Sequence, residues 1–262
     1  MRDMSQPKNL DKFETLVAIL ARLRAPGGCP WDRQQTHASL REFLLAECFE
    51  ALEALDEGNI DKLRDELGDL LLQIVFHAEI ASQAGEFTID DVIQRINQKL
   101  IHRHPHIFGS TKAASAEEVA HNWEELKQAE REKGASILGS VPKRMPALGY
   151  SQEVQRRVAQ VGFDWKDVNG VVEKLGEEIE ELKKAEGQKQ KAQEFGDVLF
   201  TLVNIARRLG VNSEAVLREA NRKFVKRFAY MEEVCCKRGV KIGDLSFDEQ
   251  NKLWEEAKRK VK

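Results

Sequence analysis

The stretch LLAECFEALEALDEG at residues 44–58 leads into RDELGDLLLQIVF at 64–76, and the same pattern returns in GEEIEELKKAEG at 176–187 and QEFGDVLFTLVNIA at 193–206. In each copy, Glu-x-x-Glu is followed after a short gap by Glu-x-Gly-Asp at the head of an apolar run. Residues three apart share one face of a helix, so each copy presents two carboxylate pairs on two consecutive helices. A short helical hairpin would bring the two pairs together.

These carboxylates are the candidate metal ligands. Four carboxylates cannot lie close together in apolar surroundings unless a positive group joins them. Mg²⁺ takes oxygen ligands, so a divalent cation is the natural candidate. The alternative is salt bridging to Lys191, Lys223 or Arg227, and one site could use both. The predicted ligands are Glu47, Glu50, Glu66 and Asp69 in the first copy and Glu178, Glu181, Glu194 and Asp197 in the second.

The placement of proline predicts an all-α fold. None of the six prolines falls at residues 31–104 or after residue 146. Long proline-free stretches rich in Leu, Ala, Glu, Lys and Arg favour helix. Alternating β-branched runs are nearly absent, and the apolar fraction of 42% suffices for a core. We therefore expect small helical bundles, each built on its paired carboxylate helices.

The repeat extends beyond the carboxylates and divides the chain into two domains. Blocks that recur in the same order are CPWD (29–32) with GFDW (162–165), NQKLIHR (97–103) with NRKFVKR (221–227), and WEELK (123–127) with WEEAK (254–258). Chance similarity between helical segments would not keep that order. The prediction is an N-terminal domain at 1–133, a linker at 134–146 and a C-terminal domain at 147–262.

Charge and composition limit the partners. A net charge of −3 gives no reason to expect nucleic acid or an acidic membrane. The N-terminus has no apolar signal core, and no run approaches membrane-spanning length. The cysteines form no C-x-x-C pair, which favours reduced thiols in a cytoplasmic protein.

A block of cations offers a way to hold phosphate. Lys223 and Arg227 lie four apart on one helical face, where they could meet polyphosphate oxygens opposite a metal cluster. An ordinary charged surface helix is the alternative. Trp254, four residues before Lys258, usually indicates packing, but it could cover a base. Glycine-rich phosphate loops are absent from the sequence, so metal and cationic side chains must hold any phosphate.

Four stretches, CPWDRQQTH (29–37), LLAECFEALEA (44–54), DELGDLLLQIVFHAEIA (65–81) and RHPHIFG (103–109), resemble the MazG family of nucleoside triphosphate pyrophosphohydrolases in its tandem-domain form. The likeness covers essentially the whole chain. It implies an all-α pyrophosphatase fold, a homodimer, and Mg²⁺-dependent cleavage of a nucleoside triphosphate (NTP) to a monophosphate (NMP) and pyrophosphate. It also implies that the metal-binding pattern of the family falls on the two carboxylate quartets.

The resemblance also assigns nucleotide contacts in the second copy. These contacts fall on Lys174, Lys223, Arg227 and Trp254. A lysine expected just before the Glu-x-Gly-Asp block is Gln190 here, with Lys191 adjacent.

Two differences between the copies favour the C-terminal one as the main catalytic site. The second copy has Glu177 where the first has Ala46. Seven residues after the aspartate, on the same helical face, the second copy has Asn204 and the first has Phe76. We therefore expect Glu177 and Asn204 to add polar groups near the metal or the nucleotide.

The predicted function is an Mg²⁺-dependent NTP pyrophosphohydrolase of broad base specificity, which cleans or controls the nucleotide pool. Glu178 or Glu181 would orient or deprotonate the attacking water. Lys223 and Arg227 would hold phosphate oxygens as charge develops. The alternative is a non-enzymatic helical regulator that binds metal or nucleotide, and a nucleic-acid binder is disfavoured by the net charge.

Overall fold

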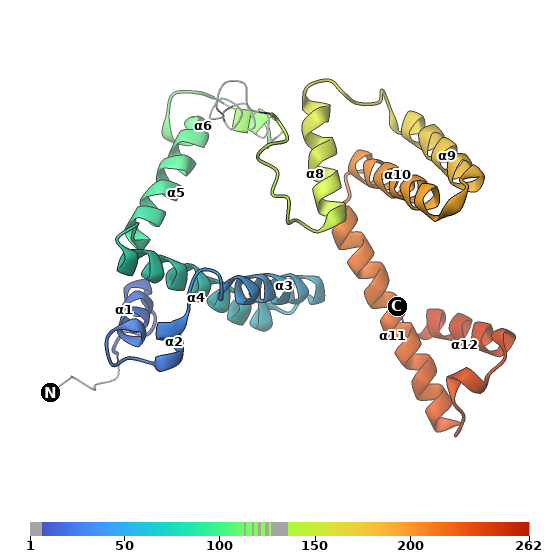
Figure 1. The fold of residues 1–262 in the computed structure, drawn as a ribbon, viewed down its shortest axis with the longest axis horizontal. Helices are drawn as coiled ribbons and strands as arrows, with labels where there is room; N and C mark the ends of the chain where they lie inside the picture. The colour runs from blue at the N-terminus through green and yellow to red at the C-terminus, as the bar shows by residue number, and fades with distance from the viewer. Residues whose placement is uncertain are drawn as a thin grey trace. The chain divides into compact units, whose positions relative to one another are not determined.

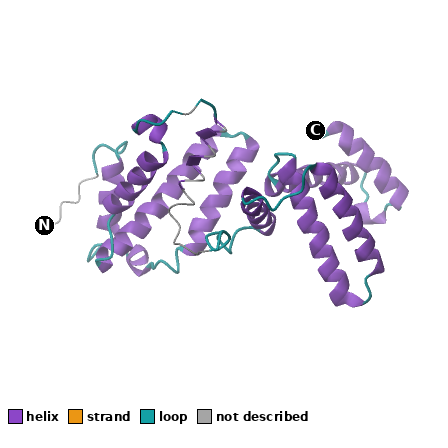
Figure 2. Ribbon diagram, turned by 90° about the horizontal axis from the view of Figure 1, so that it is seen from above, coloured by secondary structure: helices purple, strands orange, loops and turns teal. Residues whose placement is uncertain are grey.

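The computed structural model describes residues 7–112, 114–116, 118–119, 122–123, 126 and 136–261. Within these ranges the chain is helical and has no strand (Figure 2), which confirms the all-α prediction. Two compact units, Met1–Glu130 and Arg131–Lys262, divide the chain. The predicted boundaries at 133 and 134 and most of the 123–127 block lie outside the described residues.

The first unit is built around a long helical hairpin. Its helices are α1 (Phe13–Arg24), α2 (Pro30–Gln34), α3 (Arg41–Glu57), α4 (Ile60–Ala84), α5 (Ile89–Arg103) and α6 (Pro105–Phe108). Helices α3 and α4 pack along each other (Figure 1). The turn between them is tight because Gly58 adopts a positive φ of 66° and the Asn59 side chain caps α4 by accepting from the Lys62 amide.

A small core holds this hairpin against α1. Leu20, Leu40, Val75 and Phe76 are buried together, so the segment before α3 and the second half of α4 share one cluster. Burying side chains of this size stabilises the unit by roughly 1.5–3 kcal/mol each. This core fixes the end of the hairpin at which α1 packs.

The second unit repeats the hairpin. Its helices are α8 (Ala147–Gln160), α9 (Val168–Lys184), α10 (Gly187–Arg208), α11 (Ser213–Lys237), η1 (Ile242–Asp244) and α12 (Phe247–Lys260). Helices α9 and α10 pack along each other, as α3 and α4 do. Gly187 has a positive φ of 74° at the turn, and Asp167 caps α9 by accepting from the Gly170 amide. On α8, the Gln155 side chain donates to the Phe200 carbonyl, which ties α8 to α10.

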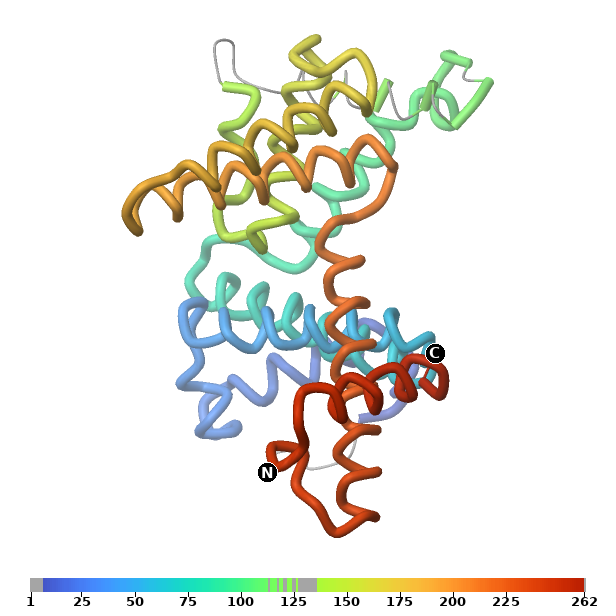
Figure 3. Tube along the Cα trace, turned by 90° about the vertical axis from the view of Figure 1, so that its right-hand side faces the viewer, coloured from blue at the N-terminus to red at the C-terminus, as the bar shows by residue number. Residues whose placement is uncertain are grey.

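The end of the second unit is a separate helix pair. Figure 3 shows α12 turning back along the C-terminal half of α11. Met231, Cys235, Leu253 and Ala257 form the buried cluster between these two helices. Among the described residues, no helix is both long and apolar enough to cross a membrane.

Candidate metal centre and nucleotide site

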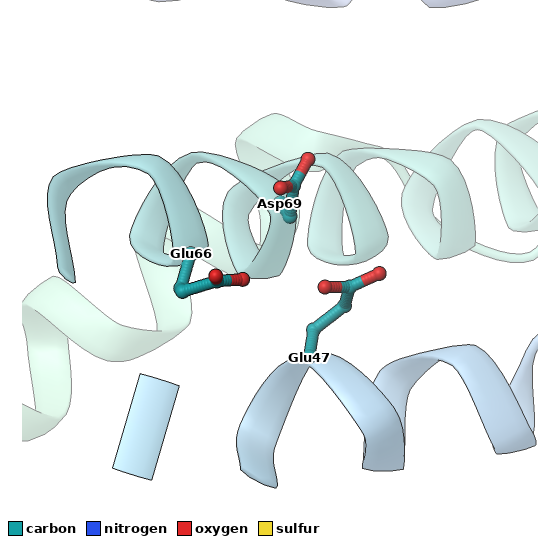
Figure 4. A group of neighbouring side chains, drawn as sticks. All are labelled: Glu47, Glu66 and Asp69. Atoms are coloured by element: carbon teal, nitrogen blue, oxygen red, sulfur yellow. The ribbon is translucent and has the colours of Figure 1, made fainter. Parts of the chain in front are cut away.

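The hairpin of the first unit brings three carboxylates together. Glu47 projects from α3, and Glu66 and Asp69 project from the facing helix α4 (Figure 4). One oxygen from each carboxylate lies within 4.8 Å of the others. This group is named the first carboxylate trio. Oxygen atoms at such spacing suit a hard divalent cation.

The negative charges of the first carboxylate trio repel one another. Partial burial raises the pKa of Glu47, and the carboxylates of Asp69, Glu50 and Glu66 raise it further. Burial also raises the pKa of Glu66, with Glu50 and Asp69 adding to the effect and Lys62 offsetting it in part. Glu50 lies outside the trio, yet its charge raises the pKa of both glutamates. A bound cation would relieve this repulsion.

The second unit holds the matching group, named the second carboxylate trio. Glu178 of α9 and Glu194 and Asp197 of α10 offer oxygens that all lie within 4.8 Å of one another. Glu178 is the most enclosed of the three, with 9% of its side chain exposed. Lys174 Nζ lies 2.9 Å from Glu178 Oε1 and 3.1 Å from Glu177 Oε2. The Lys174 ammonium group therefore already contacts the second carboxylate trio.

The remaining predicted acids and the extra lysine lie around the second trio. Glu181 stands one helical turn from Glu178 on α9 and is exposed. The carboxylate of Glu177 forms an ion pair with the Lys174 ammonium. Lys191 is exposed on α10, three residues before Glu194, which places both on one side of that helix.

Asn204 takes part in a different network. It is buried, and its Oδ1 accepts from Arg207 Nε at 3.1 Å and Nη2 at 2.7 Å. Arg207 in turn pairs with Asp164 at 2.5 Å, and Arg208 pairs with the same carboxylate at 3.1 Å. The network fastens the loop before α9 to the end of α10. Sequence reasoning missed it, although Asp164 lies in the repeated GFDW block.

The predicted phosphate-binding cations lie on α11. Lys223 Nζ is 3.3 Å from Glu219 Oε1, and Arg227 Nε donates to the Val261 carbonyl at 3.5 Å. Trp254 of α12 lies beside this segment. Within the described residues, no ion pair joins either cation to the second trio. One copy of the chain therefore places the carboxylates and the cations on different helix pairs.

Comparison with known proteins matches both units. A family model described as the MazG nucleotide pyrophosphohydrolase domain matches residues 35–108. A second, described as phosphoribosyl-ATP pyrophosphohydrolase, matches residues 152–224. Each match spans one of the two carboxylate hairpins.

Three curated proteins are similar over most of this chain. The nucleoside triphosphate pyrophosphohydrolase/pyrophosphatase MazG of Thermotoga maritima is 48% identical over 94% of the chain and 95% of its own length. The nucleoside triphosphate pyrophosphohydrolase of Escherichia coli K12 is 39% identical over 95% of the chain and 98% of its own length. The uncharacterized protein YabN of Bacillus subtilis is 45% identical over 94% of the chain, which spans 52% of YabN.

Proposed function

We propose that the chain, which belongs to the MazG family and is a hydrolase acting on the anhydride bonds of nucleoside triphosphates, is an Mg²⁺-dependent pyrophosphohydrolase of broad base specificity. Its products are NMP and pyrophosphate, and its role is to clean or control the nucleotide pool. The observation that carries this proposal is the second trio, in which Glu178, Glu194 and Asp197 converge from two helices within 4.8 Å. Because nucleoside triphosphates are intracellular metabolites, we also expect a cytoplasmic enzyme.

The donor set of the second trio fits Mg²⁺. Carboxylate oxygens are the ligands that this cation prefers, and all three acids supply them. Glu181, one turn along α9, is the proposed fourth ligand. When bound, Mg²⁺ would supply positive charge to the triphosphate oxygens. Lys174 is close enough to exchange its contact with Glu178 for one with a phosphate oxygen.

The proposed acid–base group also lies on α9. Glu178 or Glu181 orients or deprotonates the attacking water, because these carboxylates are one turn apart and flank the same site. Lys223 and Arg227 hold the phosphate oxygens as negative charge develops during cleavage. Lys191 contributes a further cation at the start of α10.

We propose a homodimer for two reasons. Among the residues that the structure describes, no ion pair joins the cations of α11 to the second trio, so a second chain can complete the site. The α9–α10 hairpin also leaves large apolar side chains in water, with Val172 51% exposed, Phe195 53% and Phe200 44%. Helices with so much exposed apolar surface need cover. A twofold dimer is the commonest way for identical chains to supply it.

We propose that the C-terminal domain, at 147–262, carries most of the turnover. In this copy Lys174 lies beside the carboxylates, whereas four residues before Glu47 the first copy has Phe43. Lys174 offers both a countercharge for Glu178 and a contact for phosphate. The first copy keeps its trio but lacks this cation.

A direct assay tests the proposed function. The full-length chain is supplied with Mg²⁺ and each NTP, and both nucleotide products and pyrophosphate are measured. The expected result is equal amounts of NMP and pyrophosphate from every NTP. Binding without turnover would favour the non-enzymatic regulator, and release of a diphosphate with orthophosphate would contradict the proposed bond cleavage.

A further inference from the structure

Two histidines of the first unit share a hydrogen bond. His37 lies in the segment between α2 and α3, and His77 lies in the second half of α4. Their Nδ1 atoms are 2.7 Å apart. The ring planes are within 2° of parallel and the ring centroids are 5.0 Å apart, so the rings meet through their nitrogen edges and not face to face. These two residues are named the histidine pair.

A hydrogen bond between two Nδ1 atoms holds one proton. One ring must donate an N–H, and the other must accept it with a lone pair. If both Nδ1 atoms carry a proton, neither can accept and the two N–H groups face each other. The histidine pair is therefore intact only while a single proton lies between the rings.

The surroundings of His77 decide which ring donates. His37 is exposed, whereas the Nε2 atom of His77 is buried and has no hydrogen-bond partner among the described residues. A buried N–H without a partner is rarer in proteins than a buried acceptor without one, because leaving it unpaired costs more free energy. His77 therefore carries its proton on Nδ1 and donates to His37, whose own proton lies on Nε2.

Acid acts on this arrangement through the exposed ring. A proton from solvent that binds to His37 occupies the Nδ1 lone pair that accepts from His77. His77 must then lose the hydrogen bond or move its proton to the buried Nε2. A positive charge on His77 does not restore the contact, because burial and the charge of His37 both lower the pKa of His77.

The other charged groups at this end of the first unit do not account for the pKa of His77. Burial is the larger cause of its shift, and the charge of His37 is the second. Helix α4 packs against α1, α3 and α5. Arg24 of α1 donates to the Gln83 side chain, which in turn donates to Glu79. The charged groups that α4, its neighbours and α2 carry at this end are Arg24, Asp32, Arg41, Glu42, Glu79 and Asp91.

The histidine pair fastens the segment that leads into the α3–α4 hairpin. Three residues after His37, Leu40 is buried in one cluster with Phe76 of α4, and α3 begins at the next residue. Between them, the hydroxyls of Thr36 and Ser39 accept from each other's backbone amides. The segment is thus a compact turn, and the histidine pair and Leu40 both hold it against α4.

We propose that the histidine pair is a pH-sensitive switch, which holds the segment before α3 against α4 at neutral pH and releases it in acid. The lowered pKa of His77 gives the direction. The neutral ring stabilises the first unit above the ordinary histidine pKa of 6.5, and this contribution is lost as pH falls below that value. The second copy cannot contain such a switch, because it has no histidine and Ile205 stands eight residues after its aspartate, where the first copy has His77.

The test compares hydrogen–deuterium exchange of the full-length chain at about pH 7.5 and about pH 5.5, on either side of the range in which histidine titrates. Rates are corrected for the pH dependence of intrinsic exchange. Peptides that cover residues 35–44 and 73–80 should lose protection by about tenfold or more at the lower pH. Peptides from α9 and α10 should keep their protection, and circular dichroism should show the same helix content at both pH values.

His37→Gln separates the switch from other effects of acid. The glutamine carbonyl accepts from His77 but takes up no proton, so the segment should stay protected at both pH values. The raised pKa values of Glu47 and Glu66 remain in this variant. A loss of protection equal to that of wild type would therefore assign the acid response to the carboxylates and overturn the proposal. His106→Gln, outside the histidine pair, is the matched control and should respond to acid as wild type does.

Nitrogen-15 NMR of the histidine side chains tests the proton count without any substitution. With His77 assigned through its neighbours in α4, its ring should be the neutral Nδ1–H tautomer at about pH 7.5 and should become charged at about pH 5.5. A neutral Nε2–H ring at the higher pH, or a neutral Nδ1–H ring that persists at the lower pH, would overturn the proposal. Equal protection of wild-type residues 35–44 at both pH values would overturn it as well.

Discussion

Lys174 Nζ lies 2.9 Å from Glu178 Oε1, one turn away on α9, and its ammonium also meets Glu177. Hydrogen bonds to these two carboxylates raise the pKa of Lys174, so it remains protonated. At the first trio the corresponding residue is Phe43, and the pKa of Glu47 is raised by burial and by its acidic neighbours. The two trios consist of the same residue types, two glutamates and one aspartate. They differ because a lysine lies beside the second trio and a phenylalanine holds the corresponding position at the first.

This ion pair predicts opposite effects of Lys174→Met on two ligands. Without the ammonium, Glu178 has no cation to release, so Mg²⁺ should bind the nucleotide-free protein more tightly. The KM for NTP should rise by about tenfold, because a phosphate contact is lost. Calorimetry and steady-state kinetics measure the two effects. A loss of affinity for Mg²⁺, or an unchanged KM, would show that Lys174 has another role.

The cations of α11 should distinguish triphosphate from monophosphate. Lys223→Ala and Arg227→Ala should each weaken NTP binding by about tenfold or more and change NMP binding much less, because the lost contacts are to the outer phosphates. Lys226→Ala, on the same helix, is the matched control and should leave both affinities unchanged. Equal losses for NTP and NMP in calorimetry would exclude a phosphate-binding role.

The helices and the carboxylate hairpins could be predicted from sequence because their signals are local. Spacings of three place Glu66 and Asp69 on one face, and Gly58 marks the turn that folds α3 against α4. Asn204 was placed on the Asp197 face by the same spacing. Its amide is held by Arg207, whose partner Asp164 comes from a distant loop, and no periodic pattern records such a contact.

The sequence also could not predict where the α11 cations lie relative to the second carboxylate trio. Their four-residue spacing predicts that the two cations share one helical face. The helical geometry of Ser213–Lys237 confirms this prediction. Which helix pair that face meets depends on the angle at which α11 leaves α10, and on any second chain. Neither is encoded in a local pattern.

A shared site predicts complementation between two inactive variants. One variant carries Asp197→Asn, and the other carries Lys223→Ala with Arg227→Ala. If carboxylates and cations come from different chains, a co-expressed mixture contains one intact site in each mixed dimer. Turnover should then recover to about a quarter of wild type, by random pairing of the two chains. No recovery, in a mixture shown by sedimentation to be dimeric, would place each site within one chain.

Glu153 predicts a pH-dependent stability that is independent of catalysis. Hydrogen bonds from Arg156 and Arg157 lower its pKa from 4.5 to about 2 in the folded chain. The carboxylate therefore stabilises the fold fully above pH 4.5, and this contribution is lost as pH falls toward about 2. Glu153→Gln should lower the free energy of unfolding by about 1–3 kcal/mol at pH 7, and by less at pH 3.

Urea unfolding at the two pH values measures this difference. Glu180→Gln is the control, because Glu180 makes an exposed pair with Lys183 that should contribute little. A Glu153→Gln deficit that is equal at both pH values would mean that the carboxylate charge does not stabilise the unit.

The second carboxylate trio should be the working metal site. Its most direct test is pyrophosphate release at saturating Mg²⁺ by two matched double variants of the full-length chain. Glu178→Gln with Asp197→Asn should retain less than about a twentieth of wild-type turnover, because the near-isosteric amides remove the ligand charges. Glu47→Gln with Asp69→Asn should retain more than about half, since the second trio is untouched. If the variant with Glu178→Gln and Asp197→Asn instead keeps half or more of wild-type turnover, the first trio supports catalysis and the assignment is wrong.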